Sequence, residues 1–229
     1  MSWTRAQYIE AVKVKLEEIS PFDEPESFIA DSDDAADTVK PIISYIEQSL
    51  DEAAHNCLRS LPLTLLHADI ARTTGIIPIN SDGVGIIPIS VNRRFVRFRQ
   101  DLLKRDITAF ITTEDPLYLI QQDKDVRGGV CKPVAVVSSD YNALAAANGQ
   151  LEIYSFPAAY YSTSSQIFYL TSIDLTKKPG SDETNYIASP IEEFIVLECA
   201  AMVASILGDT ATTQICQAQY QAKLQATLQ

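Results

Sequence analysis

The chain has 229 residues, of which 46% are hydrophobic and 21% charged, so it is long enough to build a real core in one large or two small domains. Its formal net charge of −12 repels nucleic acid and anionic membrane surfaces, which argues against a protein that wraps tightly around DNA. The four cysteines are far apart and form no Cys-x-x-Cys pair, so we expect reduced thiols in a cytosolic setting.

Residues 3–19 combine charged side chains with apolar ones spaced three and four apart, which predicts an amphipathic helix ended by Pro21. The charges within this stretch exclude a secretion signal, and no apolar run approaches the ~20 residues of a membrane span, so no membrane partner is expected. The segment after Pro21 is acidic and contains prolines, which indicates a linker or loop. A second helix is predicted over residues 41–61, with Pro41 in its first turn and one continuous apolar stripe.

From Gly75 the apolar pattern changes from a helical period to that of strands. Short apolar runs recur between turn signals such as Ser81-Asp82-Gly83 and Asn148-Gly149. These runs predict an antiparallel β region over residues 76–174, inserted between helical segments at 1–75 and 175–229. The predicted fold class is therefore α+β, a helical body of N-terminal helices and two C-terminal helices with an inserted antiparallel β region.

The first C-terminal helix is predicted over residues 190–207. The run from Ser189 to Glu192 matches a capping box with Ser189 as the N-cap. After its first turn the helix is apolar on most sides, which is typical of a helix buried in a core or between subunits. We therefore expect both Phe194 and Ile206 to be buried, and an aspartate at either position to abolish folding or assembly.

The chain ends in "GDTATTQICQAQYQAKLQATLQ", in which Gly208 stops one helix and Asp209 is expected to cap the next. This tail is small, glutamine-rich and almost uncharged. An isolated helix of this length is only marginally stable in water, so it needs a surface to pack against. That surface belongs either to its own domain or to another chain.

Motifs of known chemistry are absent from the sequence. We find no nucleophile elbow, no His-Glu-x-x-His motif and no calcium-binding loop, and the acidic residues at 31–37 are expected to be solvated. His55 and His67 are expected at the surface or its boundary. We therefore expect no enzyme, no metal and no cofactor. Carboxylate pairs can arise from distant residues, so an accessory enzyme with an unrecognised carboxylate site is one alternative function.

The one basic cluster is "NRRFVRFRQDLLKR", which spans Arg93–Arg105 with apolar residues interleaved. Such a cluster suits contacts to phosphates, and a nucleic-acid-binding module is a further alternative, for which duplex DNA binding would depend steeply on salt. It suits equally the acidic surface of a neighbouring copy or of another protein, and the net charge of −12 favours this protein contact. The residues predicted to form a subunit contact are Arg93, Arg94, Arg97 and Arg99.

Several stretches taken in order resemble the head–tail connector, or adaptor, proteins of tailed bacteriophages. "VNRRFVRFRQDLLKRDI" is similar to the Pro-x-Asp-Phe-Leu-Arg-Leu element that begins the β region in many of them. The matching residues are Phe95, Val96, Arg97 and Phe98, whereas Val91 and Arg93 or Arg94 replace the usual Pro and Asp. "DPLYLIQQDKDVRGGVCKPVAVV" with "LEIYSF" resembles the ring proteins of crAss-like phages, and "IEEFIVLECAAMVASILGD…YQAKL" resembles the closing helices of the adaptor family. The resemblance spans most of residues 40–229.

This resemblance implies a structural protein of the virion neck, at the head–tail interface, that is made in the host cytoplasm and catalyses no reaction. Adaptors form a homo-oligomeric ring, usually of twelve copies, beneath the portal protein. The ring extends the channel through which viral DNA passes without sequence-specific binding, and it offers a platform for a further neck or tail protein. C-terminal helices of the family commonly dock on the portal. The docking residues expected here are Ile215, Tyr220, Leu224 and Leu228.

Overall fold

The computed structural model describes residues 3–19, 42–90, 92–127, 129–139, 148–154, 156–160 and 166–228. The chain divides into two compact units. The helical unit comprises Met1–Asp69 and Thr176–Gln229, and the β unit comprises Ile70–Leu175. The α+β fold class predicted from the sequence is confirmed. The first strand begins at Ile70, six residues before the expected start. The sequence did not predict this start, because the first residues of the strand are mostly exposed and do not alternate between apolar and polar.

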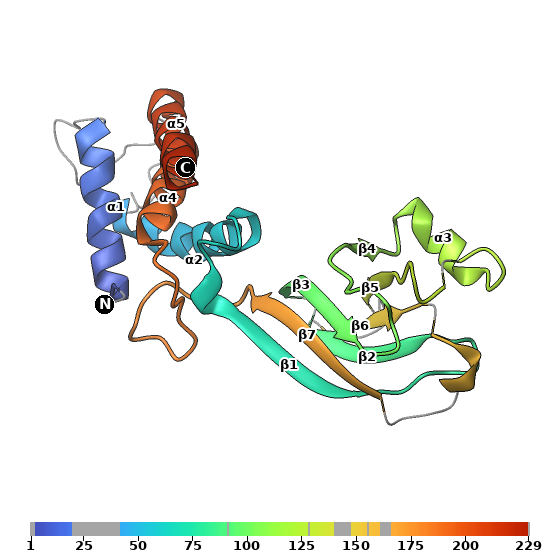
Figure 1. Cartoon of the computed structure of the whole chain (residues 1–229). Helices are drawn as coiled ribbons and strands as arrows, with labels where there is room; N and C mark the ends of the chain where they lie inside the picture. Colours follow the sequence, from blue (N-terminus) through green and yellow to red (C-terminus); the bar gives the residue numbers. More distant parts are fainter. Residues whose placement is uncertain are drawn as a thin grey trace, which may run out of the picture. The chain divides into compact units, whose positions relative to one another are not determined.

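The helical unit is built around one central helix, α4, which packs against the three others described in this unit (Figure 1). Its helices are α1 (Arg5–Ile19), α2 (Ile42–Ser60), α4 (Glu192–Ile206) and α5 (Thr210–Thr227). Most α4 side chains are buried, as the sequence predicts for a helix that is apolar on most sides. Ile206 is the exception, since 56% of it is exposed in the last turn. The expectation that Ile206 is buried within its own unit is therefore wrong, and its burial between copies stays a prediction.

The predicted capping box before α4 is also absent. The N-cap of α4 is Ile191, which makes no side-chain cap hydrogen bond, and the helix begins at Glu192. Ser189 is instead buried two residues before this N-cap, and its backbone N–H donates to Asp69. Ser189 therefore holds the loop before the helix in place, because its backbone N–H is hydrogen-bonded to the buried carboxylate of Asp69 from a distant segment.

Asp69 ends a short 3-10 helix (His67–Asp69) and anchors this loop. Its carboxylate accepts hydrogen bonds from Lys177 Nζ at 2.6 Å, Ala188 N at 3.0 Å and Ser189 N at 2.8 Å. The Asp69 side chain has no exposed surface. Burial alone would raise the pKa of Asp69, but the hydrogen bonds from Ala188, Lys177 and Ser189 together hold it below its usual value. The carboxylate is therefore a charged structural group.

The β unit contains two sheets with strand orders β1-β7-β3 and β2-β6-β5-β4. Neighbouring strands are antiparallel except β4 and β5, which pair in parallel. The strands are β1 (Ile70–Ile77), β2 (Gly85–Ser90), β3 (Arg93–Gln100), β4 (Phe110–Thr112), β5 (Ala135–Ser139), β6 (Asn148–Ile153) and β7 (Gln166–Asp174), with short helices α3 (Pro116–Gln122) and Ala158–Tyr160.

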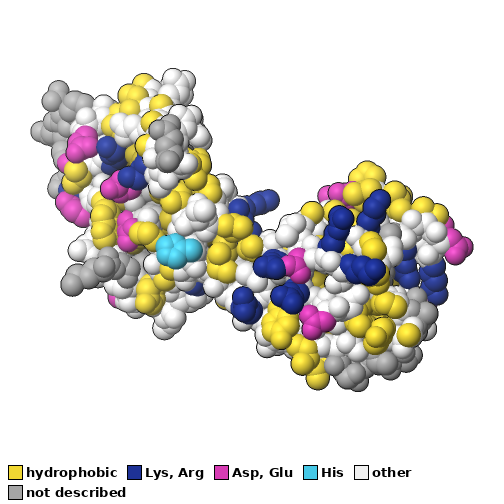
Figure 2. All heavy atoms as spheres, in the orientation of Figure 1, with side chains coloured by type: hydrophobic (Ala, Val, Ile, Leu, Met, Phe, Trp, Pro, Cys, Tyr) yellow, Lys and Arg dark blue, Asp and Glu magenta, His cyan; other side chains and the backbone are white. Residues whose placement is uncertain are grey.

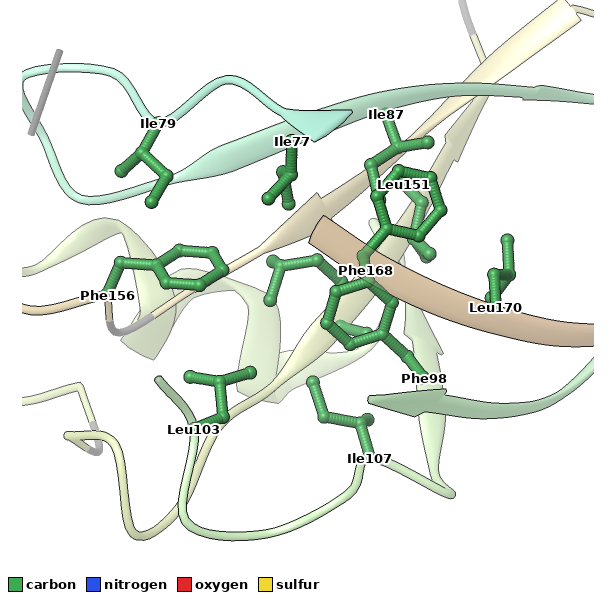
Figure 3. Close-up of a cluster of buried hydrophobic side chains, with 12 residues drawn as sticks. Ile77, Ile79, Ile87, Phe98, Leu103, Ile107, Leu151, Phe156, Phe168 and Leu170 are labelled. Atoms are coloured by element: carbon green, nitrogen blue, oxygen red, sulfur yellow. The ribbon is translucent and has the colours of Figure 1, made fainter. Parts of the chain in front are cut away.

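One hydrophobic cluster joins the two sheets, as Figure 3 shows. Phe98 of β3 and Phe168 of β7 stack within it with ring centroids 5.9 Å apart, and Ile87 and Leu151 join from the second sheet. A smaller cluster around Val136 and Tyr154 includes Tyr118 of α3. Because side chains alternate along a strand, the inward position of Phe98 and Phe168 turns their neighbours to the opposite face of the three-stranded sheet.

Candidate functional site

The opposite, outer face of the sheet β1-β7-β3 carries three exposed arginines. On β3, Phe98 is buried, whereas its neighbours Arg97 and Arg99 are exposed. Strand β7 lies between β1 and β3, and its Thr171 is the register partner of both Arg72 and Arg97. Strand pairing thus brings Arg72, from 25 residues earlier in the sequence, onto the same face as the cluster arginines.

The three arginines surround a hollow of about 330 Å³, which we call the arginine hollow. Its lining residues are Arg72, Arg97, Arg99, Asp101, Tyr169 and Thr171. Arg97 Nε lies 2.6 Å from Asp106 Oδ2, and Arg99 forms a looser pair with Asp101 at 3.7 Å. Arg72 has no ion-pair partner among the residues that the structure describes. The hollow therefore keeps a positive excess and offers guanidinium donors to an anion.

Arg93 and Arg94 do not line this hollow. The register between β3 and β7 shifts between Phe95 and Arg97, and this bulge reverses the alternation of the side chains. Phe95 therefore packs against the core, and Arg93 donates to Ser172 Oγ at 3.3 Å. Burial lowers the pKa of Arg94. The four arginines predicted to form a subunit contact are thus split, with Arg97 and Arg99 on the open face and Arg93 held within the unit.

Charge is distributed very unequally between the two units. The β unit has 10 basic and 10 acidic residues, whereas the helical unit has 8 basic and 20 acidic ones. The whole net charge of −12 thus belongs to the helical unit. Figure 2 shows basic side chains gathered on the visible face of the β unit. The chain therefore combines a strongly acidic unit with a neutral one that presents an arginine-rich face.

The second candidate surface is the C-terminal helix α5. Gly208 adopts a φ of 77°, and the Asp209 carboxylate accepts a hydrogen bond from Thr212 N at 2.9 Å, so the predicted stop and cap are confirmed. One side of α5 packs on its own unit. The Tyr220 ring meets Phe194 of α4 edge-on at 5.3 Å between centroids, and Cys216 is buried. This side of α5 therefore packs on its own unit and not on another chain.

Another side of α5 is exposed and apolar. Its small side chains recur every third or fourth residue and face away from α4, and we call them the Ala/Ile stripe. The stripe consists of Ala211, Ile215, Ala218, Ala222 and Ala226. Among the residues expected to dock on a portal, Ile215 and Leu228 are exposed, whereas Tyr220 and Leu224 are partly buried against their own unit. Docking on a portal stays a prediction. Of the four expected docking residues, Ile215 and Leu228 are exposed enough to contact another protein.

Of the four cysteines, three are buried and Cys131 is exposed. Cys57, Cys199 and Cys216 are buried, and burial raises the pKa of the Cys199 thiol to about 12, which keeps it protonated. His67 is exposed, and His55 lies half-buried on α2. Among the described residues, no three His, Cys, Asp or Glu side chains come together as a metal site. None of the described helices has the length and apolar composition of a membrane span.

Comparison with known proteins finds no family model and no curated protein that matches this sequence. The resemblance to phage adaptors stays an expectation from the order of short motifs along the chain.

Proposed function

We propose that this protein is a structural component of a tailed-phage virion neck, which forms a ring beneath the portal, extends the DNA channel and joins head to tail. The observation that carries the proposal is that one unit presents the arginine hollow while the other unit has a strong acidic excess, so each chain has two patches of opposite charge. A closed ring of identical chains uses two different patches per chain, one for each neighbour. A neck protein also needs a surface for the next layer.

Within this proposal the acidic helical unit has two consequences. Its negative charge keeps passing DNA from adhering to the ring, because like charges repel across short distances in the channel. The same charge makes neighbouring copies repel one another unless a basic surface compensates it. The arginine-rich face of the β unit supplies that compensation, and the role of the arginines as a subunit contact follows from it.

Portal docking is assigned to the exposed side of α5. A helix surface of alanine, isoleucine and glutamine buries no charge when it enters a groove, so it avoids the desolvation cost that a charged helix would have. Small side chains also allow two helix backbones to approach closely. Since the other side of α5 packs on α4, the exposed side is presented on a helix already held in place.

The docking assignment predicts that Ile215→Asp weakens capture of the protein by its portal at least tenfold, while the fold is retained. Ile43→Asp on α2 is the matched control, because both isoleucines lie on helices and both are 43% exposed. Neither variant should unfold the unit, since an exposed side chain contributes little to the core. The measurement is a pull-down on immobilised portal with circular dichroism of each variant. Equal capture of both variants would place portal docking elsewhere.

A nucleic-acid-binding module is the competing function, and the exposed arginines beside Tyr169 are the observation that favours it. Phosphate binding by these residues would show a steep loss of affinity with added salt. Two of the three arginines in the hollow already pair with carboxylates, and the one positive charge left suits a single carboxylate better than the closely spaced charges of a DNA backbone. We therefore place this function second.

A further inference from the structure

We infer that the arginine hollow is a carboxylate-binding site that receives aspartate or glutamate side chains from the helical unit of a second copy. This inference rests on the proposed ring and deepens it. The recognising residues are Arg97, Arg99 and Arg72, and Arg72 lies outside the basic cluster seen in the sequence. The surface that they bind is acidic.

The geometry of the hollow suits carboxylates. Guanidinium groups bind carboxylates through paired N–H donors, and three such groups line one hollow of about 330 Å³. The chain itself already uses this chemistry there, because Asp106 and Asp101 are bound by Arg97 and Arg99. Arg72, on the opposite edge strand, is left without an ion-pair partner among the described residues. One further carboxylate from outside would balance the remaining positive charge.

The charge distribution identifies the partner as an acidic protein surface. The described residues of the helical unit have 13 acidic and 7 basic side chains, whereas the β unit as a whole has no excess of either sign. Exposed carboxylates with no ion-pair partner in the described residues include Glu10 of α1 and Glu52 of α2. A contact between the hollow of one copy and the helical unit of the next pairs opposite charges at each step around a ring. The two patches differ, so the contact is head-to-tail.

Sedimentation velocity of the full-length chain without portal tests this inference. The variant Arg72→Glu/Arg99→Glu is compared with Lys104→Glu/Arg105→Glu, which makes the same change in net charge at exposed positions outside the hollow. We expect the hollow variant to weaken self-association at least tenfold, because it places carboxylates opposite carboxylates. The control should stay within about twofold of the wild type, and added salt should weaken wild-type association. Equal weakening of both variants, or no weakening of either, would overturn the inference.

Two parallel measurements separate this inference from the alternatives. If the hollow variant self-associates normally but loses binding to a DNA duplex of about 20 base pairs, the hollow binds phosphates and the inference is wrong. Portal capture is measured on the same samples. If the wild type and the hollow variant both assemble and both bind portal, the inference is wrong and the proposed function still stands. A wild type that neither self-associates nor binds portal contradicts both.

Discussion

Replacing Asp69 with alanine should destabilise the helical unit by about 3–5 kcal/mol, the range for removing one partner of a buried ion pair. The variant leaves the Lys177 ammonium, only 20% exposed, without its carboxylate at 2.6 Å. It also leaves the N–H groups of Ala188 and Ser189 without their acceptor. The loop before α4 depends on these bonds. Because small domains are stable by about 5–15 kcal/mol, this loss removes a large part of the total.

Urea unfolding followed by circular dichroism measures this effect. Asp51→Ala is the matched control, since Asp51 is also an aspartate paired with basic residues, Arg5 at 2.6 Å and Lys178 at 3.4 Å, but its side chain is 42% exposed. Ion pairs of this exposure contribute at most about 1 kcal/mol. Similar losses in the two variants would show that the Asp69 contacts do not hold the loop.

The same carboxylate gives a pH dependence with a defined sign. The pKa of Asp69 is lower in the folded chain than in the unfolded chain, so its charged form is stabilised by folding. Its contribution is fully present above the unfolded pKa of about 3.9 and is lost as the pH falls through the lower folded pKa. The difference in unfolding free energy between wild type and Asp69→Ala should therefore be constant near neutral pH and shrink in acid.

Phe194→Asp should prevent folding of the helical unit, whereas Ile206→Asp should leave the unit folded. Phe194 is 3% exposed and packs against Tyr220 and beneath Lys223, so the change removes a core aromatic ring and buries a carboxylate. The lost ring alone costs about 3–5 kcal/mol, and the buried charge adds several more. Ile206 lies on the same helix but is 56% exposed, so an aspartate there remains in water.

Thermal unfolding and far-UV circular dichroism of the purified variants test this pair. Phe194→Leu serves as a second variant that keeps an apolar side chain, and it should fold with reduced stability. Soluble, cooperatively unfolding Phe194→Asp would contradict the assignment of α4 as the central helix. An unfolded Ile206→Asp would mean that the end of α4 belongs to the core.

The sequence predicted the helices and their order because their apolar residues follow the helical period over several turns. Asp209 and Gly208 were predictable as cap and stop because their contacts are local. The capping box predicted at Ser189 does not form, because the N–H of Ser189 donates to Asp69, which lies 120 residues away in the sequence. The start of the β unit was missed because β1 has exposed polar residues on both faces and thus no alternating signal.

The candidate surfaces could be predicted only in part. The cluster around Arg97 and Arg99 is visible in the sequence, but the bulge before Arg97 decides which arginines face outward, and no residue pattern indicates it. Arg72 joins them only through the pairing of β1 and β3 with β7. On α5, both Tyr220 and Ile215 were predicted from the sequence as docking residues. Packing on α4 separates them, because it half-buries the first and leaves the second exposed.

The mass of the purified protein, alone and mixed with its portal, tests the proposed neck ring most directly. Native mass spectrometry counts copies because each chain adds 25.2 kDa. We expect a complex in which several copies, twelve in the manner of the adaptors it resembles, are bound to one portal assembly. A protein that keeps the mass of a single chain in both samples, with the mass of the portal unchanged, would contradict the proposal.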